Sequence, residues 1–215
     1  MPESYRVYIR RVGRRDEKEF TALMRMSQHL HEPWISPPTN AILFRHYLHR
    51  ISKEDYEGFA VCRTSDDRIV GAINLNHIVR GSFLSASLGY YVGAEFHGHG
   101  YMAEGLRLLV QYAFTTLGLH RLEANIQPEN TRSQNLVARC GFIKEGFSEG
   151  FLFINGAWRD HERWCCVDQR GGLKRGQVGS ADRSLPEEAP DEAKAARNED
   201  PGETTKNDDD NGWYA

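Results

Sequence analysis

The hydrophobic pattern of the chain changes its period at nine residues, HGHGYMAEG (97–105). Residues 83–93, FLSASLGYYVG, alternate as a strand does, whereas the apolar residues beyond Gly100 recur at the spacing of a helix. A glycine-containing connection from strand to helix leaves the first N–H groups of the helix without partners, and these groups and the helix dipole favour an anion. Gly98 and Gly100 let the backbone approach such a ligand closely. The stretch is not followed by Gly-Lys-Ser/Thr, as a P-loop is, and it is not a GxGxxG motif in a parallel strand–helix–strand unit, as in a dinucleotide-binding fold. It therefore predicts an anion-binding loop of another kind.

Two helices and four strands are predicted N-terminal to this loop. Asp16 lies three residues before Glu19, which predicts a capping box that opens a helix extending to about His31. Thr39 is predicted to cap a second helix after a proline-broken loop. The predicted strands are residues 5–11, 57–64, 69–79 and 83–93.

The elements after the loop complete one strand–helix–strand crossover and a hairpin. Residues 120–127 have a strand pattern, and Pro128 and Asn130 open a helix that closes at Gly141. Asn155-Gly156 is a strong signal for the tight turn of a hairpin. The sequence therefore predicts an α+β (mixed α/β) fold with antiparallel strands and flanking helices.

Composition divides the chain into a domain, residues 1–168, and an acidic tail, residues 169–215. Hydrophobic residues make up 40% of the 215, which is enough for a core, but they are scarce beyond Gly171. Residues 171–215 hold 11 acidic and 6 basic side chains. Such a segment does not bury enough apolar surface to offset its ordering entropy, so disorder is expected there.

Several classes of protein are disfavoured. The net charge of −3 comes from the tail, and the near-neutral body does not indicate direct DNA binding. No apolar run is long enough to span a membrane, and MPESYRVYIRR lacks the apolar core of a signal peptide. The four cysteines form no CxxC pair, which favours a reduced, cytoplasmic protein.

Motifs along residues 5–167 together resemble a known family. They are VRGSF (79–83), LGYYVG (88–93), GHGYMAEGL, LHRLEANIQPENTRS, LVARCGF, KEGF (144–147) and INGAWRDH (154–161). The chain resembles the GNAT N-acetyltransferase superfamily, and within it the RimJ-type ribosomal-protein alanine N-acetyltransferases. The usual (Gln/Arg)-x-x-Gly-x-(Gly/Ala) of that superfamily is altered, because His97 and Met102 replace its outer positions and only Gly100 is kept.

The resemblance implies the GNAT acyl-CoA N-acyltransferase fold, with a central, mostly antiparallel twisted sheet and a splayed strand pair. Acetyl-CoA is then the expected co-substrate. The residues that the resemblance assigns to it are Tyr90, Tyr91 and Val92 for the pantetheine arm, Asn130 for the pantetheine or thioester region, and His97, Gly98, His99, Gly100, Tyr101, Met102 and Ala103 around the pyrophosphate.

Two acid–base features of the loop have alternative interpretations. A His-x-His pair is able to bind zinc, but a glycine separates His97 from His99 and no third ligand is near in the sequence, so no metal is expected. Glu104 falls in the first helical turn, where a carboxylate is favourable for reasons of the helix dipole, and a catalytic role is the alternative.

Catalytic residues are harder to assign, because the carboxylates and the tyrosine that many relatives use are replaced here by Ser85, Ser87, Asn125 and Val137. Ser133 is the candidate donor to the departing sulfur, or else only a first-turn residue of its helix. Glu123 is a candidate base, and the alternative is an ion pair. A protein α-amine is neutral far more often at pH 7 than a lysine, so an enzyme for N-termini needs only a weak base.

The acceptor is the least determined part of the site. By analogy with the family, the residues expected to bind it are Asn76, Arg80, Asn125 and Asp160. The expected activity is acetyl transfer from acetyl-CoA to the N-terminal alanine or serine of a protein, such as a small-subunit ribosomal protein. Acetylation of a polyamine or antibiotic is an alternative, and so is a noncatalytic acyl-CoA-binding or ribosome-associated module.

Overall fold

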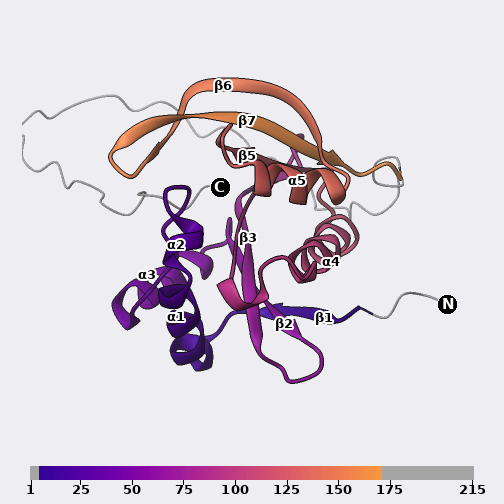
Figure 1. Ribbon diagram of the computed structural model, residues 1–215. Helices are drawn as coiled ribbons and strands as arrows, with labels where there is room; N and C mark the ends of the chain where they lie inside the picture. The colour runs from indigo at the N-terminus through magenta and orange to yellow at the C-terminus, as the bar shows by residue number, and fades with distance from the viewer. Residues whose placement is uncertain (1–4, 171–215) are drawn as a thin grey trace, which may run out of the picture.

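The computed structural model describes residues 5–170, and its elements follow the predicted order (Figure 1). The predicted acidic tail lies outside the described residues except for residues 169 and 170. The strands are β1 (Val7–Arg11), β2 (Glu57–Arg63), β3 (Ile69–Val79), β4 (Ser85–Val92), β5 (Arg121–Ile126), β6 (Ile143–Ile154) and β7 (Ala157–Val167). The helices are α1 (Glu17–Met26), α2 (Gln28–His31), α3 (Ala41–Ile51), α4 (Tyr101–Thr115) and α5 (Thr131–Arg139).

All seven strands form one sheet in the order β1-β2-β3-β4-β5-β7-β6. Only β4 and β5 pair in parallel, because α4 carries the chain from one to the other, and the remaining pairs are antiparallel. Helices α1, α2 and α3 gather on one side of the central strands and α4 lies on the other, while β6 and β7 arch over both (Figure 1). The predicted mixed α/β fold with a mostly antiparallel sheet is confirmed.

Strands β4 and β5 separate part-way along their length. They pair only from Ser85 to Leu88 on β4 and from Arg121 to Ala124 on β5, whereas β4 stays paired with β3 as far as Val92. The outer edge of residues 89–92 therefore faces a gap rather than a neighbouring strand. This is the splayed strand pair that the family resemblance implies.

Neighbouring tyrosines of β4 point to opposite faces of the sheet, because side chains alternate along a strand. The ring of Tyr91 packs against Phe20 of α1, with ring centres 5.9 Å apart, so we call this side the α1 face. The hydroxyl of Tyr90 contacts Ser133 of α5, so we call the other side the α5 face. The gap between β4 and β5 connects the two.

The predicted capping box at the start of the first helix is wrong. The Asp16 carboxylate accepts hydrogen bonds from the Arg10 guanidinium and from the Gly13 N–H, each at 2.8 Å, and does not cap α1. Glu19 instead accepts from the N–H of Ile69 at 2.6 Å, which ties α1 to the start of β3. Asp16 thus bonds residues that precede it in the chain, and Glu19 makes a contact 50 residues away, in place of the predicted motif.

The predicted first helix is also interrupted, at Ser27. Its Oγ donates to the Leu23 carbonyl at 2.7 Å and accepts from the Ala94 N–H at 2.8 Å, so the chain bends between α1 and α2. The second helix begins one residue later than predicted. Asn40, not Thr39, is the cap, and its side-chain oxygen accepts from the N–H groups of Ile42 and Leu43.

The hairpin turn follows the prediction. Asn155 and Gly156 have φ of 50° and 81° between β6 and β7, as the turn requires. The four cysteines are free, and burial raises the pKa of each thiol. Among the described helices, none has the length and apolar content needed to cross a membrane.

Candidate functional site

The glycine loop (residues 97–103) connects β4 to α4 with its amides exposed. Gly98 and Gly100 have φ of 82° and 83°, which side chains rarely adopt. The N–H groups of Ala103 and Glu104 donate to the Gly100 carbonyl, at 3.1 and 3.2 Å. Within residues 5–170, the N–H groups of residues 98–102 have no protein acceptor. The loop thus presents a group of free donors at the N-terminus of a 15-residue helix.

Arg6 and Glu104 fix the geometry of this loop. The N–H and Nε of Arg6 donate to the Glu104 carboxylate at 2.8 and 2.7 Å, and the guanidinium also donates to the His99 carbonyl at 3.0 Å. The same guanidinium lies 4.8 Å from the ring centre of Tyr101. These contacts favour the structural interpretation of Glu104 over the catalytic one.

A cavity of about 350 Å³ lies beside the glycine loop. It extends from α2 and the segment after it, past β4, to α5. Its lining residues are Leu30, His31, Trp34, Ile35, Tyr90, Tyr91, Val92, Phe96, His97, Gly98, Gly100, Met102, Ala103, Asn130, Arg132, Ser133, Asn135, Leu136 and Arg139. The cavity therefore lies along the unpaired end of β4 and contacts both the α1 face, at His31 and Tyr91, and the α5 face, at Tyr90 and Ser133.

The charge of the cavity is one-sided. Arg132 and Arg139 of α5 and His97 of the glycine loop line it, and residues 5–170 contribute no aspartate or glutamate to its lining. The free amides of the loop add partial positive charge. The site is therefore suited to a ligand that has phosphate groups at one end and an uncharged chain beyond them.

A buried hydroxyl pair lies where the cavity meets the α5 face. The phenol of Tyr90 and the Oγ of Ser133 form a short hydrogen bond, and both side chains are buried. Burial raises the pKa of Tyr90, and the bond to Ser133 only partly opposes this. The phenol is therefore protonated at neutral pH and able to donate.

Asn130 positions Ser133 within this pair. Its side-chain oxygen accepts the Ser133 N–H at 3.1 Å, which caps α5 as predicted. The same side chain lines the cavity. The first turn of α5 is thus held against the cavity by its own cap.

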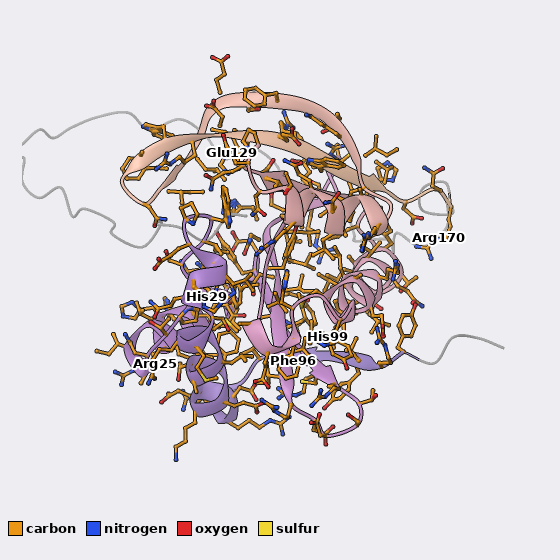
Figure 2. All side chains as sticks on the ribbon, in the orientation of Figure 1. Arg25, His29, Phe96, His99, Glu129 and Arg170 are labelled. Atoms are coloured by element: carbon orange, nitrogen blue, oxygen red, sulfur yellow. The ribbon has the colours of Figure 1, made fainter. Side chains whose placement is uncertain are left out.

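The structure brings most of the expected cofactor residues together. The cavity is lined by Tyr90, Tyr91, Val92, His97, Gly98, Gly100, Met102, Ala103 and Asn130, together with Ser133. His99, which is labelled in Figure 2, and Tyr101 are not among the lining residues. Their rings stack on each other, with centres 5.9 Å apart. The Ala103 N–H is already bonded to Gly100, so the amides free for a ligand are those of the preceding residues.

Other predicted residues lie outside the cavity lining. Glu123 forms an ion pair with Arg121 at 2.6 Å, and Arg80 is exposed and donates to the Leu117 carbonyl at 2.6 Å. Asp160 accepts from the Gly150 N–H at 2.7 Å within the hairpin. These three have structural partners, and their catalytic or substrate-binding roles stay predictions.

Asn76 and Asn125 lie on the α1 face, one on each side of β4. The cross-strand register places Asn76 opposite Ser87, and Asn125 is in step with Gly89, which shares the face of Tyr91. Both side chains are buried, and the Nδ2 of Asn76 and the Oδ1 of Asn125 have no partner among the described residues. Unpaired buried polar atoms of this kind are suited to contacts with a ligand.

Sequence reasoning missed several residues of the cavity, namely Leu30, His31, Trp34, Ile35, Arg132 and Arg139. His31 appeared in the sequence only as the end of a helix. No local signal marks it, because its place depends on contact between α2 and β4, which are far apart in the chain.

Metal ligands are a separate question. Over the part of the chain that the structure describes, no group of three or more His, Cys, Asp or Glu side chains is arranged to hold a metal ion. His97 lines the cavity, whereas the Nδ1 of His99 lies 3.0 Å from the His97 carbonyl.

Comparison with known proteins identifies the family. A family model described as an acetyltransferase (GNAT) domain matches residues 6–143. The chain belongs to the GNAT acetyltransferase family. This confirms the resemblance seen in the sequence, and the splayed strands and the glycine loop are the corresponding features of this GNAT chain.

Named relatives agree with this assignment. The chain is 40% identical to the probable N-acetyltransferase YjcK of Bacillus subtilis over 116 residues, which is 54% of this chain and 64% of that protein. It is 42% identical to the ribosomal protein uS5-alanine N-acetyltransferase of Escherichia coli K12 over 103 residues, 48% of this chain and 53% of that one. The chain therefore spans less than two thirds of the length of these two relatives.

Other similar proteins carry different names. A spermidine N(1)-acetyltransferase of Vibrio cholerae is 28% identical over 141 residues, 64% of this chain and 77% of that protein. Among solved structures, RimJ of Mycobacterium smegmatis in complex with CoA-disulfide has a TM-score of 0.70 and 28% identity, covering 75% of this chain and 82% of that chain. The relatives thus share the family and differ in the acceptor that their names give.

Proposed function

We propose that this GNAT chain transfers acetyl from acetyl-CoA to the N-terminal α-amine of a protein that begins with alanine or serine. The observation that carries the proposal is the charge of the cavity, which combines arginines and free amides with no carboxylate. Such a lining suits the phosphates of CoA and does not attract a polycation. The uS5-alanine acetyltransferase of E. coli supports a ribosomal protein as the acceptor.

The residues of the cavity fit acetyl-CoA at successive positions. Arg132, Arg139 and the amides of the glycine loop are proposed to hold the phosphates, because the arginines line the cavity and the amides are free. Apart from the Val92 carbonyl, which is bonded to His31, the backbone edge of residues 89–92 has no strand partner on its outer side and is able to hydrogen-bond the amides of the pantetheine arm. When bound, acetyl-CoA supplies an activated thioester carbonyl.

Ser133 and Tyr90 are proposed to act at the sulfur. Either hydroxyl of this pair is able to donate to the other. In the proposed step the Tyr90 phenol donates to the Ser133 Oγ, which leaves the Ser133 proton free to be donated to the departing sulfur. Burial keeps the phenol protonated, so the pair retains its proton until the C–S bond breaks. Glu123 is not needed for this step and is held by Arg121.

The preference for an α-amine follows from proton equilibria. A terminal amine with a pKa of about 7.8 is neutral roughly 14% of the time at pH 7, whereas an amine near 10.4 is neutral about 0.04% of the time. A site without a carboxylate offers little help in deprotonating the more basic amine. The Oδ1 of Asn125, which has no partner among the described residues, is proposed to accept a hydrogen bond from the acceptor.

The experiment is a thiol-release assay with purified protein and acetyl-CoA. The acceptors are peptides that begin with Ala or Ser, the same peptides with a blocked N-terminus and an internal lysine, and spermidine. Turnover of the free N-termini alone supports the proposal, and mass spectrometry locates the acetyl group. Turnover of spermidine alone favours the polyamine alternative, which the Vibrio relative represents. CoA binding with no turnover of any amine favours the noncatalytic module.

A further inference from the structure

His31 has one ring nitrogen engaged and one free. The side chain is only 4% exposed, and its Nε2 lies 2.8 Å from the Val92 carbonyl. A carbonyl oxygen only accepts, so Nε2 carries the proton and Nδ1 of the neutral ring has an open lone pair. Within the described residues this buried Nδ1 has no hydrogen-bond partner.

The position of His31 is at the gap between the splayed strands. Val92 is paired with Gly71 of β3, and the next residue, Gly93, donates its N–H to the Val70 carbonyl. The pair of Val92 and Gly71 is therefore a non-hydrogen-bonded pair, so the carbonyl of Val92 points away from β3 and toward the gap. His31 bonds this carbonyl and also lines the cavity. It therefore contacts the cavity at the splayed edge of β4.

The face of the sheet distinguishes His31 from the hydroxyl pair. Its ring packs edge-on against Tyr91, with centres 6.1 Å apart, so it lies on the α1 face. Ser133 contacts Tyr90 and lies on the α5 face. Asn125 shares the α1 face with His31, and its Oδ1 is also without a partner. An acceptor amine that approached from the α1 face would meet His31, which lies on the opposite face of β4 from Ser133.

The surroundings keep the imidazole neutral. Burial lowers the pKa of His31, the bond to Val92 partly opposes this, and the nearby His29 lowers it further. The titratable groups that act on the ring are His29 of its own helix and Tyr91 of β4, and the cavity lining contributes no carboxylate that would favour the charged form. A neutral ring with an open lone pair is a base.

We propose that the Nδ1 of His31 accepts the proton of the attacking amine. In this step the amine nitrogen bonds to the thioester carbonyl carbon, the C–S bond breaks, and one amine proton passes to Nδ1. The leaving sulfur takes a proton from Ser133. Ser133 then takes a proton back from water, and His31 releases its proton to water, so that the protons balance. The inference rests on the proposed N-acetylation and adds its base, which the sequence did not indicate.

The decisive variant is His31→Gln. A glutamine amide has its nitrogen near the position of Nε2 and preserves the donor to Val92, but it has no basic nitrogen. His31→Ala removes both functions and is the matched comparison. Each protein is assayed for turnover at saturating acetyl-CoA between pH 5 and 9, and its CoA affinity is measured by calorimetry.

We expect His31→Gln to lower turnover about 100-fold, with CoA affinity unchanged. The pH profile of kcat/KM for the wild type should fall at low pH through two ionisations, of the amine and of His31, and that of His31→Gln through the amine alone. Unchanged turnover and an unchanged profile would overturn the proposal. So would a loss of turnover that follows a loss of CoA binding, because His31 would then only shape the pocket.

The test also separates this inference from the proposed acceptor. If the wild type acetylates spermidine and not peptides, the choice of acceptor is wrong, and the comparison of variants proceeds with spermidine. If no amine is turned over, slow hydrolysis of acetyl-CoA is measured, with water in place of the amine. A lower hydrolysis rate in His31→Gln at equal CoA affinity supports the base, and an equal rate overturns it.

Discussion

The phenol of Tyr90 and the hydroxyl of Ser133 form a hydrogen bond between β4 and α5, at the point where the cavity meets the α5 face. This pairing predicts two different sizes of effect on catalysis. Ser133→Ala should lower kcat about 100-fold, since it removes the group that donates to sulfur. Tyr90→Phe should lower kcat about tenfold, which corresponds to the loss of one hydrogen bond of about 1.4 kcal/mol.

The measurement is steady-state thiol release together with CoA affinity for each variant. Tyr90→Phe should add little to Ser133→Ala in the double variant, because the phenol acts through the serine. Tyr8→Phe is a control, since that phenol bonds Asp67 on the surface at 3.1 Å. Equal turnover in Ser133→Ala and wild type would remove Ser133 from the mechanism.

Glycine at position 98 is predicted to matter for the ligand more than for the fold. Gly98 and Gly118 both have positive φ, 82° and 67°, and a Cβ at either meets nothing within 4 Å. Alanine at either position should therefore lower the unfolding free energy by a similar amount, about 1–2 kcal/mol, because of backbone strain alone. Only Gly98→Ala should also weaken CoA binding, because it displaces the free amides of the glycine loop.

Denaturant unfolding and calorimetric titration with CoA test this pair of variants. Gly118 follows the C-terminal end of α4, whereas the glycine loop lies at its N-terminal end. Gly118→Ala therefore reports the cost of strain without a change at the ligand site. Equal CoA affinities in the two variants would show that the loop amides do not hold the phosphates.

Glu104 is predicted to affect binding and not chemistry. Glu104→Gln weakens the contacts to Arg6, which hold the glycine loop through the His99 carbonyl. CoA affinity should fall severalfold while kcat at saturating acetyl-CoA stays near the wild-type value. Asp168→Asn is the control, because it weakens an ion pair with Arg170, at 2.8 Å, that follows the end of β7 and lies away from the loop. A loss of kcat in Glu104→Gln at full saturation would restore the catalytic interpretation.

The fold was largely predictable because its signals are local. The change of hydrophobic period around Gly100 and the Asn155-Gly156 turn each depend on a few neighbouring residues, and the structure has a strand–loop–helix and a hairpin at these places. The first helix was mispredicted for the opposite reason. Ser27 bends it by accepting the N–H of Ala94, and Glu19 bonds Ile69 in place of a local cap.

The candidate site likewise has a part that the local sequence predicts and a part that depends on contacts between distant segments. The free amides of the loop follow from glycines before a helix, so a sequence pattern reveals them. The role of His31 arises from contact with Val92, 61 residues away, and from burial that leaves one nitrogen unpaired. Neither the pairing nor the burial leaves a pattern in the residues around His31. The one-sided charge of the cavity likewise becomes visible only when α5 packs beside the loop.

Asp16 predicts how stability depends on pH. Burial opposes ionisation of this carboxyl, but hydrogen bonds from Arg10 and Gly13 outweigh burial and lower its pKa below the ordinary 3.8. A carboxyl with a lowered folded pKa stabilises the fold at any pH above its unfolded pKa, and this contribution is lost as the pH falls through the folded pKa. The ion pair with Arg10, 2.8 Å long and mostly buried, should therefore contribute fully at neutral pH.

The test is Asp16→Asn, which keeps the shape of the side chain and removes its charge. At pH 7 we expect a loss of about 2 kcal/mol of unfolding free energy, the range for hydrogen bonds to charged groups. The difference from wild type should shrink below about pH 4, where the wild-type carboxyl begins to protonate in the unfolded state. Denaturant unfolding at pH 7 and at pH 3 measures both values. A difference that is the same at the two pH values would mean that the variant acts through packing and not through the charge of Asp16.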